Sequence, residues 1–239
     1  MRAIGSLALY FTAEDTCSVE KPETRAALLG ALLEAACSGA SEVLSDPDTP
    51  LRAGPQLAAR KGYLAILACA VEEEAYDLLL YAAARSLTAP FFSPWGIHRM
   101  VRVESEQGNS PFVRHLSFTH TAPAPLSGPV RLKAYSPLVA PVDILADLDR
   151  AQRELAKRLQ QPSLSPEGEL PHWNFLEISM NALSSNATHR KGHITLTSSH
   201  PFGGLILQYA LLKGFGSDKR NGFGHLDLCL DSSKRRPLP

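Results

Sequence analysis

The chain has 239 residues, of which 44% are hydrophobic and 20% are charged, and its formal net charge is zero. This length can form one large or two small domains with a buried core. Because the net charge is zero, the chain as a whole is not the strongly basic kind that is typical of nucleic-acid-binding proteins. The charge is divided unevenly, because residues 1–89 carry 7 Lys/Arg and 12 Asp/Glu whereas residues 90–239 carry 17 and 12. This asymmetry either indicates an anionic partner for the C-terminal part or is chance scatter.

Other features argue against a metalloprotein, a secreted protein and a membrane protein. The four cysteines are far apart, and none stands at zinc-ligand spacing from another cysteine or a histidine. We therefore expect reduced thiols and neither a metal nor another cofactor. The longest uncharged apolar run, residues 63–71, is too short to cross a bilayer. These observations predict a cytoplasmic protein that does not bind a membrane.

The first residues predict a strand followed by a helix. Apolar residues alternate imperfectly over residues 3–12, which is typical of a half-buried strand. Pro22 fits the first position of a helix, and four leucines between Leu28 and Leu33 recur at helical spacing, with the helix reaching about Cys37. A strand followed by a helix opens a ferredoxin-like βαββαβ unit.

Residues 56–87 are rich in alanine and leucine, a composition that favours helix. We therefore expect a helical insertion in an N-terminal ferredoxin-like region of residues 1–95. The alternative is that residues 62–71 form a buried strand, because periodicity alone does not separate a short buried strand from a buried helix.

The remainder, residues 96–239, is expected to form a second region that mixes strands and helices. The predicted strands are residues 100–104, 113–120, 129–135, 174–183, 192–197 and 222–230, and the predicted helices are residues 142–160 and 203–212. The fourth and fifth of these strands are expected to pair around residues 188–191. The fold class is then α+β, with two ferredoxin-like units in tandem.

Two groups of basic residues in this second region are candidates for phosphate contacts. Arg150, Arg153 and Lys157 fall at positions i, i+3 and i+7 of the predicted helix, so they share one face, which we call the basic face. This face either contacts nucleic-acid phosphates or is solvated and partly offset by neighbouring carboxylates. Arg190 and Lys191 lie at the predicted turn and are candidates for the same kind of contact.

A doubled glycine motif stands between the last helix and the last strand. Its four glycines are Gly214, Gly216, Gly222 and Gly224, each pair flanking a phenylalanine. Glycine lacks Cβ, so such a loop can adopt positive φ angles and lie close to another backbone or to a ligand. Its backbone N–H groups can cradle a phosphate, and Lys219 and Arg220 add positive charge at its tip. The motif therefore predicts an anion-binding loop.

This pattern, with Gly-apolar-Gly on both sides of five residues, resembles the glycine-rich loop of the RAMP superfamily, the RNA-binding proteins of CRISPR systems. Over roughly residues 200–230 the chain is most similar to the endoribonucleases that cut CRISPR repeat RNA into guides. The resemblance implies a protein that binds the repeat hairpin of precursor RNA and works with other CRISPR effector subunits. It also implies metal-independent cutting, in which a 2′-hydroxyl attacks the adjacent phosphorus.

The catalytic residues of such enzymes are only partly matched in this chain. Many of them carry a histidine on or near the first helix, whereas residues 21–38 contain none. Arg25 is the nearest candidate to stabilise transition-state charge, and Tyr10 is a candidate to position or relay a proton. The missing histidine and the expected helical insertion resemble the divergent enzymes of type IV systems. The missing histidine equally fits a non-catalytic RAMP subunit that holds guide RNA, and an unrelated ferredoxin-like protein with a glycine hairpin is a third alternative.

Overall fold

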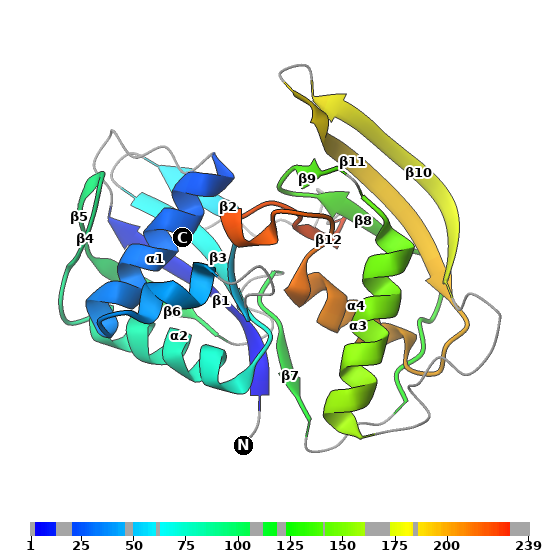
Figure 1. The fold of residues 1–239 in the computed structure, drawn as a ribbon, viewed down its shortest axis with the longest axis horizontal. Coiled ribbons are helices and arrows are strands. Elements are labelled where there is room, and N and C mark those ends of the chain that lie inside the picture. The colour runs from blue at the N-terminus through cyan, green and yellow to red at the C-terminus, as the bar shows by residue number, and fades with distance from the viewer. Residues whose placement is uncertain are drawn as a thin grey trace.

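The structure is a computed structural model, which describes residues 3–12, 21–45, 50–60, 63–105, 112–118, 123–140, 142–160, 173–183 and 186–229. The elements form two units that lie side by side, one from each part of the chain (Figure 1). No helix within these ranges is long and apolar enough to cross a membrane.

The first unit is a βαββαβ arrangement. Its elements are β1 (Ala3–Thr12), α1 (Pro22–Ala36), β2 (Leu51–Arg60), β3 (Tyr63–Ala70), α2 (Glu73–Ser86) and β6 (Met100–Glu104). The sheet has the order β2-β3-β1-β6 with every neighbouring pair antiparallel, and α1 and α2 pack on one of its faces. Shorter strands accompany it: β4 (Phe91–Ser93) pairs with β5 (Gly96–His98), and β7 (His115–Ser117) pairs with the beginning of β1.

The second unit repeats this arrangement. Its elements are β8 (Val130–Ala134), α3 (Ile144–Leu159), β10 (Trp173–Leu183), β11 (Asn186–Ser198), α4 (Gly203–Lys213) and β12 (Leu226–Leu228). The sheet order β10-β11-β8-β12 corresponds strand for strand to that of the first unit, and the short β9 (Leu138–Val139) also pairs with β11. The α+β class and the tandem ferredoxin-like units are therefore confirmed.

The helical insertion expected within residues 56–87 is wrong. Residues 51–60 and 63–70 form the antiparallel hairpin β2–β3, and only α2 in this stretch is an α-helix. Every residue of β3 after Tyr63 is buried, so the strand lacks the alternation of apolar and polar residues that marks a half-exposed strand. The alternative of a buried strand is confirmed, and the first unit is a simple ferredoxin-like unit.

Two boundaries also differ from expectation. The first sheet extends beyond residue 95, because β6 and β7 pair with β1, so the expected division between residues 1–95 and 96–239 cuts through this sheet. Residues 188–191 do not form the turn of the later hairpin but lie inside β11, and β10 ends at Leu183 only three residues before β11 begins at Asn186. This hairpin is longer than predicted, since its polar residues remain in the strands.

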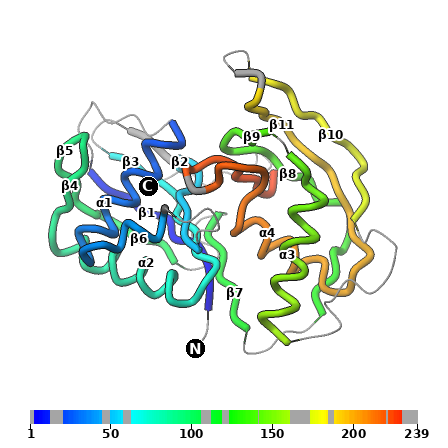
Figure 2. The backbone as a smooth tube through the Cα atoms, in the orientation of Figure 1, coloured from blue at the N-terminus to red at the C-terminus, as the bar shows by residue number. Residues whose placement is uncertain are grey.

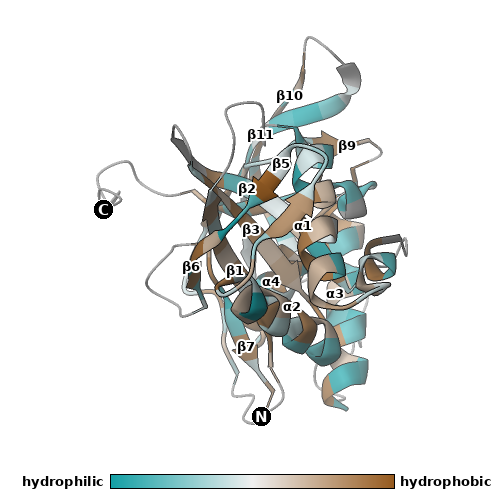
Figure 3. Ribbon diagram, turned by 90° about the vertical axis from the view of Figure 1, so that its left-hand side faces the viewer, coloured by the Kyte–Doolittle hydropathy of each residue, from teal (hydrophilic) through white to brown (hydrophobic). Residues whose placement is uncertain are grey.

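The two units share one apolar core. Leu67 and Cys69 of β3 belong to the same buried cluster as Ile206 and Leu211 of α4, so α4 packs against the face of the first sheet that α1 and α2 leave open. Figure 3 shows this division, with β3 and α4 mostly apolar and α3 largely hydrophilic. A shared core of this kind places the second unit's last helix, and the loop that follows it, against the first unit.

Candidate RNA-binding site

The glycine-rich loop, residues 214–224, lies where the two units meet (Figure 2). All four glycines have positive φ angles, from +75° to +82°. A Cβ at Gly222 would lie 2.6 Å from the carbonyl oxygen of Pro22 in the first unit, and a Cβ at Gly216 would lie 3.1 Å from that of Val139 in the second. The expectation that this loop needs glycine is confirmed, because both the left-handed backbone and the close approach exclude a side chain.

The backbone N–H groups of these glycines are already used within the protein. The donor–acceptor pairs are Gly214 N with Ala210 O at 2.9 Å, Gly216 N with Asp147 Oδ2 at 2.7 Å, Gly222 N with Lys219 O at 3.1 Å and Gly224 N with Pro137 O at 2.9 Å. In this structure these four groups donate within the protein and are not directed at a ligand, and phosphate binding by the loop stays a prediction. The glycines shape the loop and hold it against both units.

Arg25 lies beneath this loop. Its side chain is only 3% exposed, its Nε donates to the carbonyl oxygen of Gly54 at 2.7 Å, and its Nη2 donates to that of Gly222 at 3.3 Å. Burial lowers the pKa of Arg25 to about 10, so the guanidinium stays charged at neutral pH. Through these two carbonyl groups the buried guanidinium joins α1, β2 and the loop.

Tyr10 lies on the other face of the first sheet from α1. It packs with the core that the two units share, whereas α1 belongs to the core on the opposite face. Its hydroxyl donates to Glu104 Oε2 at 3.2 Å, and burial together with this carboxylate raises the pKa of Tyr10 to about 12. Such a tyrosine keeps its proton at neutral pH. The structure therefore does not bring Tyr10 and Arg25 into one catalytic group.

Lys219, at the tip of the loop, is held by α3. Its Nζ lies 3.1 Å from Asp147 Oδ1, and its side chain is 17% exposed. Burial lowers the pKa of Lys219, while Asp147 acts in the opposite direction. The backbone of Arg220 lies in the short 3-10 helix Lys219–Asn221, and its side chain lies outside the described part of the structure.

The basic face of α3 is exposed, as expected. Arg150 and Lys157 line a groove of about 820 Å³ between α3, α4 and residues 71–72 of the first unit, and Arg153 is exposed outside it. The charged side chains along this groove are the cations Arg150, Lys157, Arg158 and Lys213 and the carboxylates Glu72 and Glu154. The cations outnumber the carboxylates, so the groove favours an anionic ligand.

Arg190 and Lys191 are exposed residues of β11 rather than of a turn. The preceding His189 stacks on Phe223 of the glycine-rich loop, with ring centroids 5.0 Å apart and planes at 5°. These two basic residues therefore lie on the strand that touches the loop, although the loop and the basic face of α3 are on different elements of the second unit.

A buried polar cluster joins the last strand to the first unit. Arg114 pairs with Asp227, and His225 Nε2 lies 3.4 Å from Asp227 Oδ2. His225 Nδ1 lies 3.1 Å from Nη2 of Arg52 on β2, so Nδ1 accepts and the proton of the neutral ring is on Nε2, facing Asp227. Burial lowers the pKa of His225 to about 4, so the ring is neutral at pH 7.

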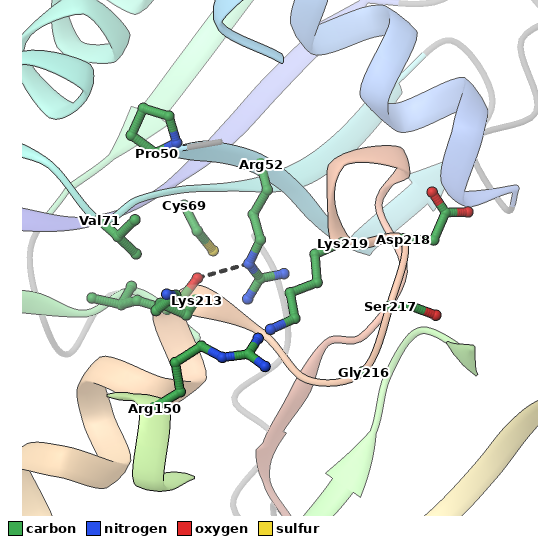
Figure 4. A pocket seen from close by; sticks show the side chains of 11 residues that line it. Pro50, Arg52, Cys69, Val71, Arg150, Lys213, Gly216, Ser217, Asp218 and Lys219 are labelled. Carbon is green, nitrogen blue, oxygen red and sulfur yellow. Dashed lines mark hydrogen bonds between the residues drawn. The ribbon is translucent and has the colours of Figure 1, made fainter. Parts of the chain in front are cut away.

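A small cavity lies between the units beside this cluster, with a volume of about 190 Å³. We call it the inter-unit cavity. Four cations line it, Arg52, Arg150, Lys213 and Lys219, together with the exposed Asp218. Figure 4 shows the charged ends of Arg52, Arg150 and Lys219 pointing toward one another from three different elements. No group of three or more His, Cys, Asp or Glu side chains in the described ranges could hold a metal ion.

The sequence did not single out Arg52, Lys213 or the buried cluster around His225. Of these residues, only Arg52 has a feature in the sequence that could have drawn attention to it: it is a charged residue between the apolar Leu51 and Ala53, both of which are buried. Lys213 directly precedes the first glycine triplet and is an ordinary basic residue at the end of a helix. Only the packing of α4 against the first sheet brings these side chains together.

Comparison with solved structures identifies the fold. A Cas6 product complex has a TM-score of 0.67 at 13% identity, covering 96% of this chain and all of that chain. Thermus thermophilus Cas6 has a TM-score of 0.56 at 13% identity, covering 95% and 98% of the two chains. A RAMP protein binding different RNA substrates has a TM-score of 0.56 at 10% identity, covering 95% and 100%. No protein-family model and no curated protein matches the chain.

The likeness covers nearly the whole chain, whereas the glycine motif covered only residues 200–230. The likeness to the Cas6 product complex covers 96% of this chain, which folds as two βαββαβ units in tandem. The chain therefore has the tandem ferredoxin-like fold of the Cas6 and RAMP proteins.

Proposed function

We propose that the protein binds the repeat RNA of CRISPR transcripts and takes part in processing it in the cytoplasm. The observation that carries this proposal is the likeness, over nearly the full length of both chains, to a Cas6 product complex. The neighbouring RAMP protein is named for binding RNA, and two other neighbours, of which this chain covers 47% and 30%, are named as Cas6-RT-Cas1–Cas2 complexes. RNA and further CRISPR subunits are accordingly the proposed partners.

The basic face of α3 is the proposed contact for an RNA hairpin. Its three side chains are exposed on one helix, and two of them line a groove in which cations outnumber carboxylates. The deep, narrow major groove of A-form RNA hides the base edges, so such a helix would contact mainly phosphates and read shape. Arg190 and Lys191 are exposed on β11 next to His189, which stacks on Phe223 of the glycine-rich loop, and they are proposed as further phosphate contacts on opposite faces of this strand.

The finer proposal is that the protein cuts the repeat RNA by attack of a 2′-hydroxyl on the adjacent phosphorus. Metal independence is part of this proposal. Arg25 would serve as a positioning residue, because it fixes the loop through Gly222 and its guanidinium is buried. Tyr10 keeps its proton at neutral pH and so would donate rather than accept one. The general base is not among the residues that the sequence singled out.

The second candidate function is a non-catalytic RAMP subunit that holds guide RNA. The placement of Arg25 and Tyr10 on opposite faces of the first sheet favours this reading, because no catalytic pair is formed by them. The type IV form loses part of its support, since the helical insertion that suggested it is absent from residues 50–60 and 63–87.

The test is an incubation of the protein with repeat RNA from the CRISPR array of its source organism. We expect cleavage at one position that persists in excess chelator, and a 2′-deoxy substitution just upstream of the scissile phosphate should abolish cleavage while preserving binding. Cleavage of the deoxy substrate at the normal rate would overturn the mechanism. Tight binding without any cleavage would favour the non-catalytic subunit, and the absence of binding would overturn the proposed function.

A further inference from the structure

The inter-unit cavity contains a buried charged group that lacks a partner. Arg52 is 3% exposed, and its Nη1 has no hydrogen-bond partner in the structure. The other nitrogens of this guanidinium are fully used: Nε donates to Leu212 O at 2.7 Å, while Nη2 donates to Leu211 O at 2.7 Å and meets His225 at 3.1 Å. A buried donor that is left unpaired costs about 1–3 kcal/mol, so it calls for a ligand.

The position of this donor is rigidly determined. The two carbonyl groups that hold Arg52 belong to the last turn of α4, and its Cζ would lie only 3.0 Å from a Cβ at Gly214, so the guanidinium lies directly against the loop backbone. Because Nε and Nη2 together make three polar contacts, the planar guanidinium is held in one orientation and the direction of Nη1 is defined. Arg52 is among the residues that line the cavity, and Figure 4 shows its charged end directed toward those of Arg150 and Lys219.

The charges around the cavity are unbalanced. Lys213 pairs with Glu154, and Lys219 pairs with Asp147 at 3.1 Å. Arg150 is 3.8 Å from Asp147, near the limit for an ion pair, and that carboxylate is already engaged by Lys219 and by Gly216 N. Asp218 also lines the cavity, so its four cations are opposed by three carboxylates, Glu154, Asp147 and Asp218. The net charge is positive, and the ligand that fits is an anion.

The volume indicates the size of that anion. A water molecule needs roughly 10–15 Å³ of such space, and pockets for drug-sized ligands begin at about 300 Å³. The cavity has about 190 Å³, which has room for a phosphate group together with several water molecules. Three cations that approach from β2, α3 and the loop match a tetrahedral oxyanion, whose oxygens accept in several directions, better than a planar carboxylate.

We propose that the inter-unit cavity is a phosphate-binding site, with Arg52 Nη1 as its inner donor and with Arg150 and Lys219 at its mouth. The bound phosphate group belongs either to RNA, as a backbone or terminal phosphate, or to free phosphate. Because Arg52 comes from the first unit and the other two from the second, the phosphate would also link the units. The cavity adjoins the groove along the basic face, because Val71, Arg150 and Lys213 line both. Of the three residues of the basic face, only Arg150 reaches the cavity.

The test measures binding of inorganic phosphate to the whole protein by isothermal titration calorimetry. We expect saturable binding to one site, weakened by about tenfold in Arg150→Gln and in Lys219→Gln, because one charge-assisted hydrogen bond is worth roughly that factor. Arg99→Gln is the control, since Arg99 is an exposed arginine of the first unit that lines neither the cavity nor the groove, and the affinity of this variant for phosphate should stay within about twofold of the wild-type value. Arg150 is 55% exposed, so its replacement leaves the fold intact.

Two results would overturn the site: no saturable binding by the wild-type protein, or equal affinity in the Arg150→Gln and wild-type proteins. A competition arm, which rests on the proposed function, assigns the source of the phosphate. Displacement of phosphate by a short single-stranded RNA identifies an RNA phosphate, and simultaneous binding of both identifies free phosphate. Failure of RNA to bind at all would refute the proposed function without affecting the calorimetric result for phosphate.

Discussion

Replacing Arg25 with alanine distinguishes a structural role for this residue from a catalytic one. The change would leave the carbonyl groups of Gly54 and Gly222 unpaired, at a cost of about 2 kcal/mol each. The lost burial of the aliphatic stem adds about 2 kcal/mol. Burial lowers the pKa of Arg25 from 12.5 to about 10, so removing the charge returns about 3 kcal/mol of desolvation. We therefore expect the free energy of unfolding to fall by about 3 kcal/mol.

The measurement is urea unfolding followed by circular dichroism, with the free energy obtained by linear extrapolation and the slope checked for constancy. Arg153→Ala is the control, because Arg153 is an exposed arginine on α3 and its loss should change stability by less than about 0.5 kcal/mol. If Arg25→Ala stays within that same margin, the buried clamp is wrong. If the Arg25→Ala variant keeps its stability but cleaves RNA about 10²-fold more slowly, Arg25 stabilises the transition state and is not a positioning residue.

Three further predictions concern the loop, the buried cluster and the basic face. Gly222→Ala should lower the free energy of unfolding by more than Gly39→Ala, because both glycines have φ near +80° but only at Gly222 would the Cβ meet a carbonyl, that of Pro22; equal losses would show that the loop can move away. The pKa of His225 is about 4 in the folded protein and about 6.5 in the unfolded chain, so the unfolded state takes up the proton first as the pH falls. Between pH 7 and pH 5 the free energy of unfolding of the wild type should therefore fall by about 2 kcal/mol more than that of His225→Asn, and parallel stability curves would contradict a neutral buried ring. Replacing the whole basic face with glutamine should weaken binding of a repeat hairpin more than binding of an unstructured RNA and should reduce the salt dependence of both; equal weakening would separate this helix from hairpin recognition.

The sequence by itself determined the elements whose conformation depends on residues close together in the chain. The helical spacing of leucines predicted α1, and the amphipathic pattern of residues 142–160 predicted α3, whose first turn is capped by Asp143 accepting from Ala146 N at 3.0 Å. The doubled glycine motif predicted a loop that needs positive φ angles, and all four glycines have them. Each of these properties depends on residues close together in the chain.

The tertiary structure alone decided whether residues 56–70 were helix or strand. Residues after Tyr63 in β3 are buried because α1 and α2 pack on one face of the sheet and the second unit packs on the other. A strand covered on both faces carries no alternating pattern, so its sequence does not differ from that of a buried helix.

The chemistry of the candidate site was likewise decided by packing. Arg25 stands in the first turn of a helix, where an arginine is usually exposed, yet it is buried because Gly222 passes over the start of α1. The hydrogen-bond contacts of Arg52 with α4 and His225 join residues that are 159 to 173 positions apart in the sequence, and the contact of Lys219 with Asp147 joins residues 72 positions apart. Local sequence patterns do not record such pairings, because only the shared core of the two units fixes the distance between these groups.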